Sequence, residues 1–150
     1  MRLLTINHEH HEIAGVVTPD GIITIAKINE KFAKSWETEM FPLISKGQIP
    51  EMTKWYNSGG KAQLEALAEK AIPLDQAVFA PLYRQPAKIF GIGLNYKNHA
   101  ADLSEKAPET FPASFYKPAT AIIGHGDTII IPAQSEKTTG EAELGVIMGR

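Results

Sequence analysis

The chain contains no cysteine, and this absence removes several kinds of chemistry. A disulfide scaffold, a thiolate zinc site and a cysteine nucleophile all require that residue. The absence is compatible with a reducing compartment, and we expect a cytoplasmic protein. The sequence also lacks a secretory signal at its first residues and any apolar run of membrane-spanning length, so we expect no membrane association.

The chain also lacks an excess of charge of either sign. The chain has 15 basic and 17 acidic residues, a net charge of −2 at pH 7, and its Lys and Arg residues are scattered. Without a basic stripe or a polybasic segment, neither nucleic acid nor an anionic membrane is expected as a partner. With 43% hydrophobic and 21% charged residues, the composition is that of a globular protein with an ordinary core.

The N-terminal residues show the pattern of a small antiparallel meander. We expect strands at residues 2–6, 12–18 and 21–28, with a turn at Thr18-Pro19-Asp20-Gly21. Three histidines at residues 8, 10 and 11 fall at the tip of the first hairpin. Because no apolar packing would fix them there, we expect exposed side chains and no metal site.

Residues 30–72 are expected to be helical. Leu64, Leu67, Ala68 and Ala71 follow helical spacing, and Pro73 ends the run. Four aromatic residues are expected to pack these helices on the meander: Trp36, Phe41, Trp55 and Tyr56. Prolines at 73, 81 and 86 then predict an irregular connection, so we expect one domain at residues 1–85 and a second at 86–150.

The second domain is expected to begin with a buried strand at residues 88–93. Its Gly91-Ile92-Gly93 resembles a dinucleotide fingerprint, but the third glycine would fall at Tyr96, so no nucleotide cofactor is predicted. Asn95 is placed to start a short helix in which Asp102 follows His99 by one turn. A carboxylate there would orient the imidazole as a general base, although a helical histidine that only packs or caps fits the same pattern.

Lys117 lies between an aromatic pair and a proline, which predicts a partly shielded ammonium that holds an anionic substrate. The alternative is that this side chain extends into solvent. Residues 124–127 predict a turn with His125 exposed, and residues 128–132 predict another strand.

Two carboxylates, Glu141 and Glu143, precede the apolar run at residues 144–148. In a strand both would point to one face and repel, unless a cation neutralises them or both face water. A hard divalent ion such as Mg²⁺ or Mn²⁺ prefers such oxygen ligands. Because the chain stops at Arg150 directly after this run, we expect it to be the front portion of a larger fold.

Four motifs in one order make the sequence resemble the fumarylacetoacetate hydrolase family over about residues 88–150. The matching positions are Gly93, Asn95, Tyr96 and His99; Phe115, Lys117, Pro118 and Thr120; Gly126, Asp127, Ile129 and Pro132; and Glu141, Glu143, Leu144 and Ile147. The resemblance implies an α+β protein: a small N-terminal domain of sheet and helices, followed by the start of a mixed, β-rich catalytic fold. A homodimer is also expected.

The resemblance further implies that Glu141 and Glu143 are ligands of Mg²⁺ or Mn²⁺, with a third carboxylate further downstream. His99 would lie on a lid helix, and Lys117 would hold the oxygens of a small anionic 2-oxo acid. Family members commonly pair the histidine with a glutamate three residues on, where this chain has Asp102, and Glu105 is an alternative partner. Gly140 also stands at a position that is often aromatic.

The function implied is divalent-metal-dependent cleavage of a small 2-oxo or diketo acid, by acylpyruvate-type hydrolysis or oxaloacetate-type decarboxylation. Isomerisation between enol and keto forms and ureidoglycolate-type lysis use the same metal and residues, and both remain alternative functions. A different class of function is a non-catalytic interaction form that lacks the third metal ligand.

Overall fold

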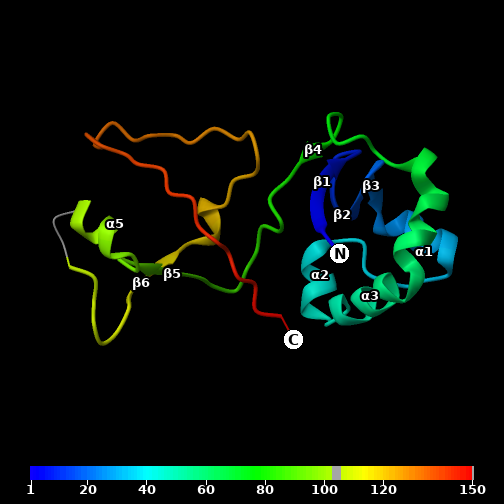
Figure 1. Cartoon of the computed structure of the whole chain (residues 1–150). Coiled ribbons are helices and arrows are strands. Elements are labelled where there is room, and N and C mark those ends of the chain that lie inside the picture. The colour runs from blue at the N-terminus through cyan, green and yellow to red at the C-terminus, as the bar shows by residue number, and fades with distance from the viewer. Residues whose placement is uncertain (103–105, 150) are drawn as a thin grey trace. The chain divides into compact units, whose positions relative to one another are not determined.

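The computed structural model describes residues 1–102 and 106–149, apart from the side chains of Lys97, His99 and Asp102. The chain divides into two units, one made of Met1–Tyr83 and Ile123–Arg150 and the other of Arg84–Ile122. Both units contain strands and helices, and the chain has the α+β class expected from the sequence (Figure 1). The division into domains at residues 1–85 and 86–150 stays a prediction.

The first unit is built on a four-stranded antiparallel sheet in the order β3-β2-β1-β4. Its strands are β1 (Leu3–His8), β2 (His11–Thr18), β3 (Gly21–Thr24) and β4 (Val78–Phe79). Leu3 pairs with Val16 and Val16 with Ile23, so these three side chains share one face. The first two strands of the predicted meander are thereby confirmed.

A tight two-residue turn joins β1 to β2. His8 lies directly opposite His11, and the two central residues, Glu9 and His10, have positive φ angles of 50° and 67°. Positive φ at both positions is the geometry of a type I′ turn, whose twist matches that of the flanking strands. The three histidines of this hairpin are exposed, as the sequence predicted.

The third predicted strand is shorter than expected, because residues 25–28 belong to helix α1 (Ile25–Phe32). The Thr24 side chain accepts a hydrogen bond from the Lys27 backbone N–H at 3.4 Å and so caps the helix. Ile25 and Ile28 are both fully buried, at helical spacing. The short apolar run fits the two-residue period of a strand and the 3.6-residue period of a helix, and the cap together with this burial favours the helix.

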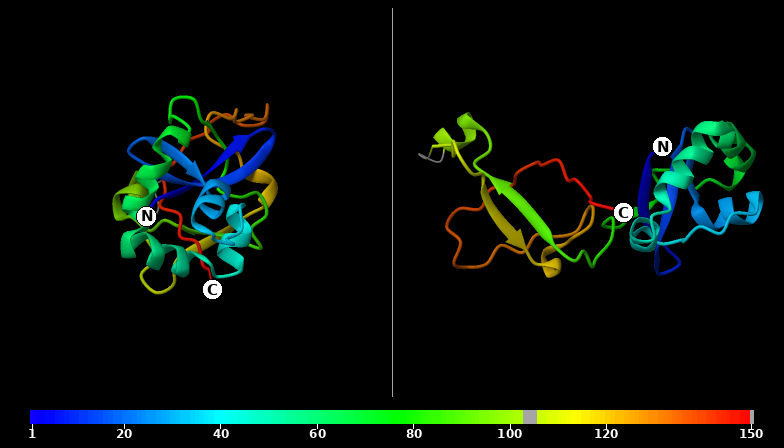
Figure 2. Two further views of the ribbon diagram at one scale, coloured as in Figure 1. Left: turned by 90° about the vertical axis from the view of Figure 1, so that its right-hand side faces the viewer. Right: turned by 90° about the horizontal axis from the view of Figure 1, so that it is seen from below.

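Further helices follow where residues 30–72 predicted them, but broken into short pieces: α2 (Met40–Ser45), α3 (Ile49–Trp55), α4 (Lys61–Gln63) and the 3₁₀ helix η2 (Leu64–Lys70). Between α3 and α4 lies the kink η1 (Tyr56–Gly60), where Ser58 and Gly59 have non-helical backbone angles. The first three helices, α1 to α3, gather on one side of the sheet (Figures 1 and 2). The shared core is formed by Ala14, Val16, Ile23, Ile25, Ile28, Trp36, Met40, Leu43, Met52, Leu64 and Leu67.

The predicted role of the aromatic residues is confirmed for three of the four. Trp36 belongs to the core, and Trp55 and Tyr56 pack against it. The prediction is wrong for Phe41, which is 44% exposed and lies beside Tyr83 with the ring centroids 5.6 Å apart.

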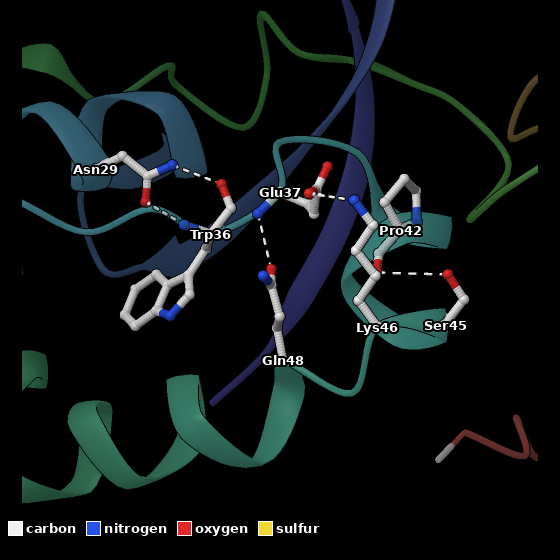
Figure 3. A network of polar contacts seen from close by, with 7 residues as sticks. All are labelled: Asn29, Trp36, Glu37, Pro42, Ser45, Lys46 and Gln48. Atoms are coloured by element: carbon white, nitrogen blue, oxygen red, sulfur yellow. Dashed lines mark hydrogen bonds and ion pairs between the residues drawn. The ribbon is translucent and has the colours of Figure 1, made fainter.

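Side-chain hydrogen bonds fix the connection between α1 and α3 (Figure 3). The Asn29 amide donates to the Trp36 carbonyl at 2.7 Å and accepts from the Trp36 N–H at 3.2 Å. The Gln48 side chain accepts from the Glu37 N–H at 2.8 Å, and Lys46 pairs with the Glu37 carboxylate at 2.6 Å. The contacts of Asn29 and Gln48 satisfy backbone groups of Trp36 and Glu37 that lie outside regular structure.

Helix α1 ends at Phe32, and the capping residue after it, Ala33, has a left-handed backbone with φ of 49° and is exposed. An L-residue with a Cβ is strained there, and glycine is not. Ala33→Gly should raise the free energy of unfolding by about 1 kcal/mol. Urea unfolding with an unchanged m-value measures this gain, and Ala26→Gly, inside the same helix and also exposed, should lose about 0.5–1 kcal/mol. A loss in both variants would contradict the assignment of strain to Ala33.

The second unit contains β5 (Ile89–Gly93), α5 (Lys97–Asp102), β6 (Ala113–Lys117) and the 3₁₀ turn η3 (Ala119–Ala121). Strands β5 and β6 form a two-stranded antiparallel sheet. The strand predicted at residues 88–93 is confirmed, but it is not buried, since Phe90 is 55% exposed. In the part of the chain that the structure describes, no helix is both long and apolar enough to span a membrane.

Residues 123–149 contain a turn but no strand among those described. Asp127 accepts a hydrogen bond from the Gly124 N–H at 2.6 Å, and His125 is exposed, which confirms the predicted turn. The strand expected at residues 128–132 is wrong, and the apolar run at residues 144–148 is not a strand either: Ile130 and Leu144 are 87% and 93% exposed in irregular backbone. An apolar run becomes a strand only where a neighbouring strand accepts its backbone hydrogen bonds, and the described residues provide none here.

Candidate active site

Strand β6 presents Lys117 on one face of the β5–β6 sheet. Lys117 pairs with Ile89 and Phe115 pairs with Gly91, so Lys117 and Phe115 lie on the same face. The Lys117 ammonium lies 5.6 Å from the centroid of the Phe115 ring. A Cβ at Gly91 would overlap that ring, so the glycine allows Phe115 to lie across β5. The ammonium is therefore held above an aromatic face by a cation–π contact.

The Lys117 side chain is exposed, and so is the Phe115 ring, at 39%. The expectation of a partly shielded lysine is therefore wrong, and the side chain follows the alternative, extension into solvent, since among the described residues β6 pairs with β5 alone. An exposed ammonium on a rigid strand can still bind an anion, but at the cost of competition from water and salt.

Helix α5 follows β5 after three residues and carries His99 and Asp102. The short helix predicted after Asn95 is confirmed, and its Ala100 N–H donates to the Tyr96 carbonyl at 2.9 Å. Ala100 is 1% exposed and anchors the helix. The side chains of His99 and Asp102 lie outside the described part of the structure, and Glu105 lies outside the described residues, so the roles predicted for the three stay predictions.

An open pocket of about 230 Å³ lies between the end of β5 and the loop before β6. It is lined by Gly93, Leu94, Asn95, Ala107, Pro108, Glu109, Thr110, Phe111 and Pro112. Leu94 has a φ of 53°, which is an uncommon and strained conformation for a leucine. None of the sequence motifs includes residues 107–112, so the sequence analysis did not find this pocket. The one available signal was the pair of prolines, Pro108 and Pro112, that follows the predicted helix.

Glu141 and Glu143 lie in the irregular segment of the first unit, and both are exposed. Their carboxylate oxygens are the donors that Mg²⁺ and Mn²⁺ prefer, so the chemistry of this pair fits a hard divalent ion. Within the described residues, no three His, Asp or Glu side chains gather as a metal site. Because both residues lie in irregular backbone and not in a strand, the sequence argument that they share one face does not hold here, and the pair offers two oxygen donors.

Comparison with known proteins identifies a family for the second half of the chain. Residues 88–150 match the family described as fumarylacetoacetate (FAA) hydrolase C-terminal. No solved structure matches the chain.

Several relatives are similar over part of their length. An uncharacterised protein of Archaeoglobus fulgidus is 44% identical over 77 residues, which is 51% of this chain and 30% of that protein. The mitochondrial oxaloacetate tautomerase FAHD2 of Arabidopsis thaliana is 39% identical over 46% of this chain and 30% of its own length. The mitochondrial oxaloacetate tautomerase Fahd2a of Rattus norvegicus is 33% identical over 53% of this chain and 25% of its own length.

The aligned part of the chain therefore spans less than a third of each of these relatives. The matched family segment contains α5, Lys117, Glu141 and Glu143, which are the residues that the sequence motifs singled out. The family match and these relatives show that residues 88–150 are similar to the C-terminal domain of fumarylacetoacetate hydrolases.

Proposed function

We propose that the protein is a divalent-metal-dependent enzyme that cleaves a carbon–carbon bond in a small 2-oxo acid. The observation that carries this proposal is the family match at residues 88–150, which includes a carboxylate pair, a lysine and a helical histidine in the expected order. Proteins of this family are generally dependent on a divalent metal, and Mg²⁺ and Mn²⁺ suit the two carboxylates.

Glu141 and Glu143 would hold the ion, which when bound supplies a positive charge that stabilises an enolate as the bond breaks. Lys117 would bind the carboxylate of the substrate as a point charge, and the Phe115 ring beneath its ammonium limits the positions it adopts. His99 would take a proton from the water that attacks the distal carbonyl carbon. Asp102 or Glu105 would orient the imidazole. Hydrolysis then yields a carboxylic acid and the enolate of the shorter 2-oxo acid.

A second candidate is interconversion of keto and enol forms without bond cleavage. The names of the Arabidopsis and rat relatives, both oxaloacetate tautomerases, favour it. The two reactions share the enolate and differ in how it arises: tautomerisation forms it by removal of a proton and returns a proton to carbon or oxygen, whereas cleavage forms it when the acyl group passes to water or a carboxylate leaves as CO₂. The same residues suit both, and a homodimer remains part of the proposal for either reaction.

A panel of 2-oxo acids, assayed with Mg²⁺, with Mn²⁺ and with EDTA, tests this function. We expect metal-dependent loss of the diketo absorbance of acylpyruvates, with formation of pyruvate measured by a coupled assay. Loss of enol absorbance from oxaloacetate without release of CO₂ or pyruvate would favour the tautomerase. Turnover that is unchanged by EDTA would contradict the proposed role of the metal. An absence of turnover with either ion would contradict the proposal that the protein is an enzyme.

A further inference from the structure

The pocket beside β5 has a composition that restricts what it can hold. Five of the described residues that line it are apolar with a side chain: Leu94, Ala107, Pro108, Phe111 and Pro112. Asn95 and Thr110 add neutral polar groups, and among the described lining residues Glu109 alone has an ionisable side chain. The pocket volume of about 230 Å³ is well above the roughly 30 Å³ that one water occupies in the liquid. The pocket therefore suits a small organic group that is not an anion.

The position of the pocket along the hairpin relates it to Lys117. Gly93 lines the pocket and pairs with Ala113, on the same face as Phe115 and Lys117. The Lys117 ammonium lies over the ring of Phe115, which is two residues nearer to Ala113 on β6. Phe115 and Ala113 are two residues apart on β6, a span of about 7 Å, which is close to the length of a diketo acid of five or six carbons. A substrate whose carboxylate meets Lys117 can therefore place its other end in the pocket.

We infer that this pocket receives the distal, uncharged end of the substrate, and that Glu109 selects against substrates with a second carboxylate at that end. The inference rests on the proposed function and narrows its substrate class to acylpyruvates with a neutral acyl group. A distal carboxylate would lose hydration against the apolar walls and would be repelled by Glu109. A neutral acyl chain would instead bury apolar surface against Leu94 and the two prolines.

The test compares two acylpyruvates of equal chain length, one ending in a methyl group and the other in a carboxylate. The same bond is cleaved in both, so the ratio of their kcat/KM values reports on the distal group alone. We expect the wild-type protein to prefer the methyl-ended acid by about tenfold or more. Glu109→Gln should reduce this preference by about three- to tenfold, because the interaction of two charges near the surface is partly screened. Glu109→Lys should reduce it further.

Glu65→Gln serves as the matched control, because it removes the same charge from an exposed position of the first unit. Its substrate preference should equal that of the wild type. If Glu109→Gln and Glu109→Lys both leave the ratio unchanged while turnover persists, the inference is wrong and the proposed function stands.

If no 2-oxo acid is turned over with a divalent ion, the proposed function fails, and binding then decides the inference separately. Titration with the methyl-ended acid should shift the amide NMR signals of Gly93, Asn95 and Thr110, and the carboxylate-ended acid should shift them only at higher concentration. Equal shifts with both acids, or no shift with either, would overturn the assignment of the pocket.

Discussion

Glu141→Gln and Glu143→Gln are each expected to weaken Mg²⁺ or Mn²⁺ binding by at least about 100-fold and to abolish metal-dependent turnover. An amide oxygen is a poorer ligand than a carboxylate for a hard cation, and each change removes one of two negative charges that attract the ion. Isothermal calorimetry with Mg²⁺ and Mn²⁺ measures the affinity directly, and the assay of acylpyruvate cleavage measures turnover.

Neither substitution should unfold the protein. Both side chains are exposed, and loss of one charge relieves repulsion within the pair. Thermal unfolding in the absence of metal should therefore show an unchanged or slightly raised midpoint. Loss of affinity through loss of fold would appear as a lowered midpoint and would remove the argument for direct ligation.

Glu136→Gln is the matched control, because Glu136 is an exposed glutamate in the same irregular segment. It changes the net charge by the same amount and should leave metal affinity and turnover at wild-type values. An unchanged metal affinity in Glu141→Gln, by contrast, would show that the carboxylate pair only faces water, the alternative that the sequence left open.

The N-terminal unit could be anticipated from sequence because its patterns are local. Alternating residues predicted β1 and β2, and the turn between them needed only two residues. Residues 25–28 were predicted as the end of a strand and are helical, since Ile25 and Ile28 fit a strand or a helix until the Thr24 cap and the core around them are known. Tertiary contacts decide such short apolar segments.

The structure of the C-terminal residues was harder to predict, because an apolar run indicates burial but does not identify the element that covers it. Residues 144–148 have a strand composition, yet Leu144 is 93% exposed and no strand pairs with it among the described residues. The backbone conformation of Leu94 could not be predicted either, because nothing in a Gly-Leu-Asn sequence indicates a positive φ at the leucine. The pocket depends on that bend together with a loop that lies more than ten residues away, so no local motif predicts it.

His99→Ala is expected to lower kcat for acylpyruvate cleavage by about 10²–10⁴, the usual contribution of a general base. Metal affinity should stay near that of the wild type, because the histidine is not proposed as a ligand. Steady-state kinetics with saturating Mg²⁺ or Mn²⁺ measure the first quantity, and calorimetry measures the second. Asn98→Ala, an exposed neighbour on α5, controls for any disturbance of the helix and should keep kcat within about twofold of wild type.

Substitution of the two candidate partners separates orientation from proton transfer. Asp102→Asn and Glu105→Gln each keep the size of a side chain and remove its charge. Substitution of the true partner should lower kcat, but by less than His99→Ala does, because the partner orients the imidazole without carrying the proton. In the His99→Ala background the same substitution should have almost no further effect, since residues that act as a unit are not additive. If kcat in His99→Ala equals that of the wild type, the histidine has a structural role on α5, and the carboxylate three residues on needs no catalytic explanation.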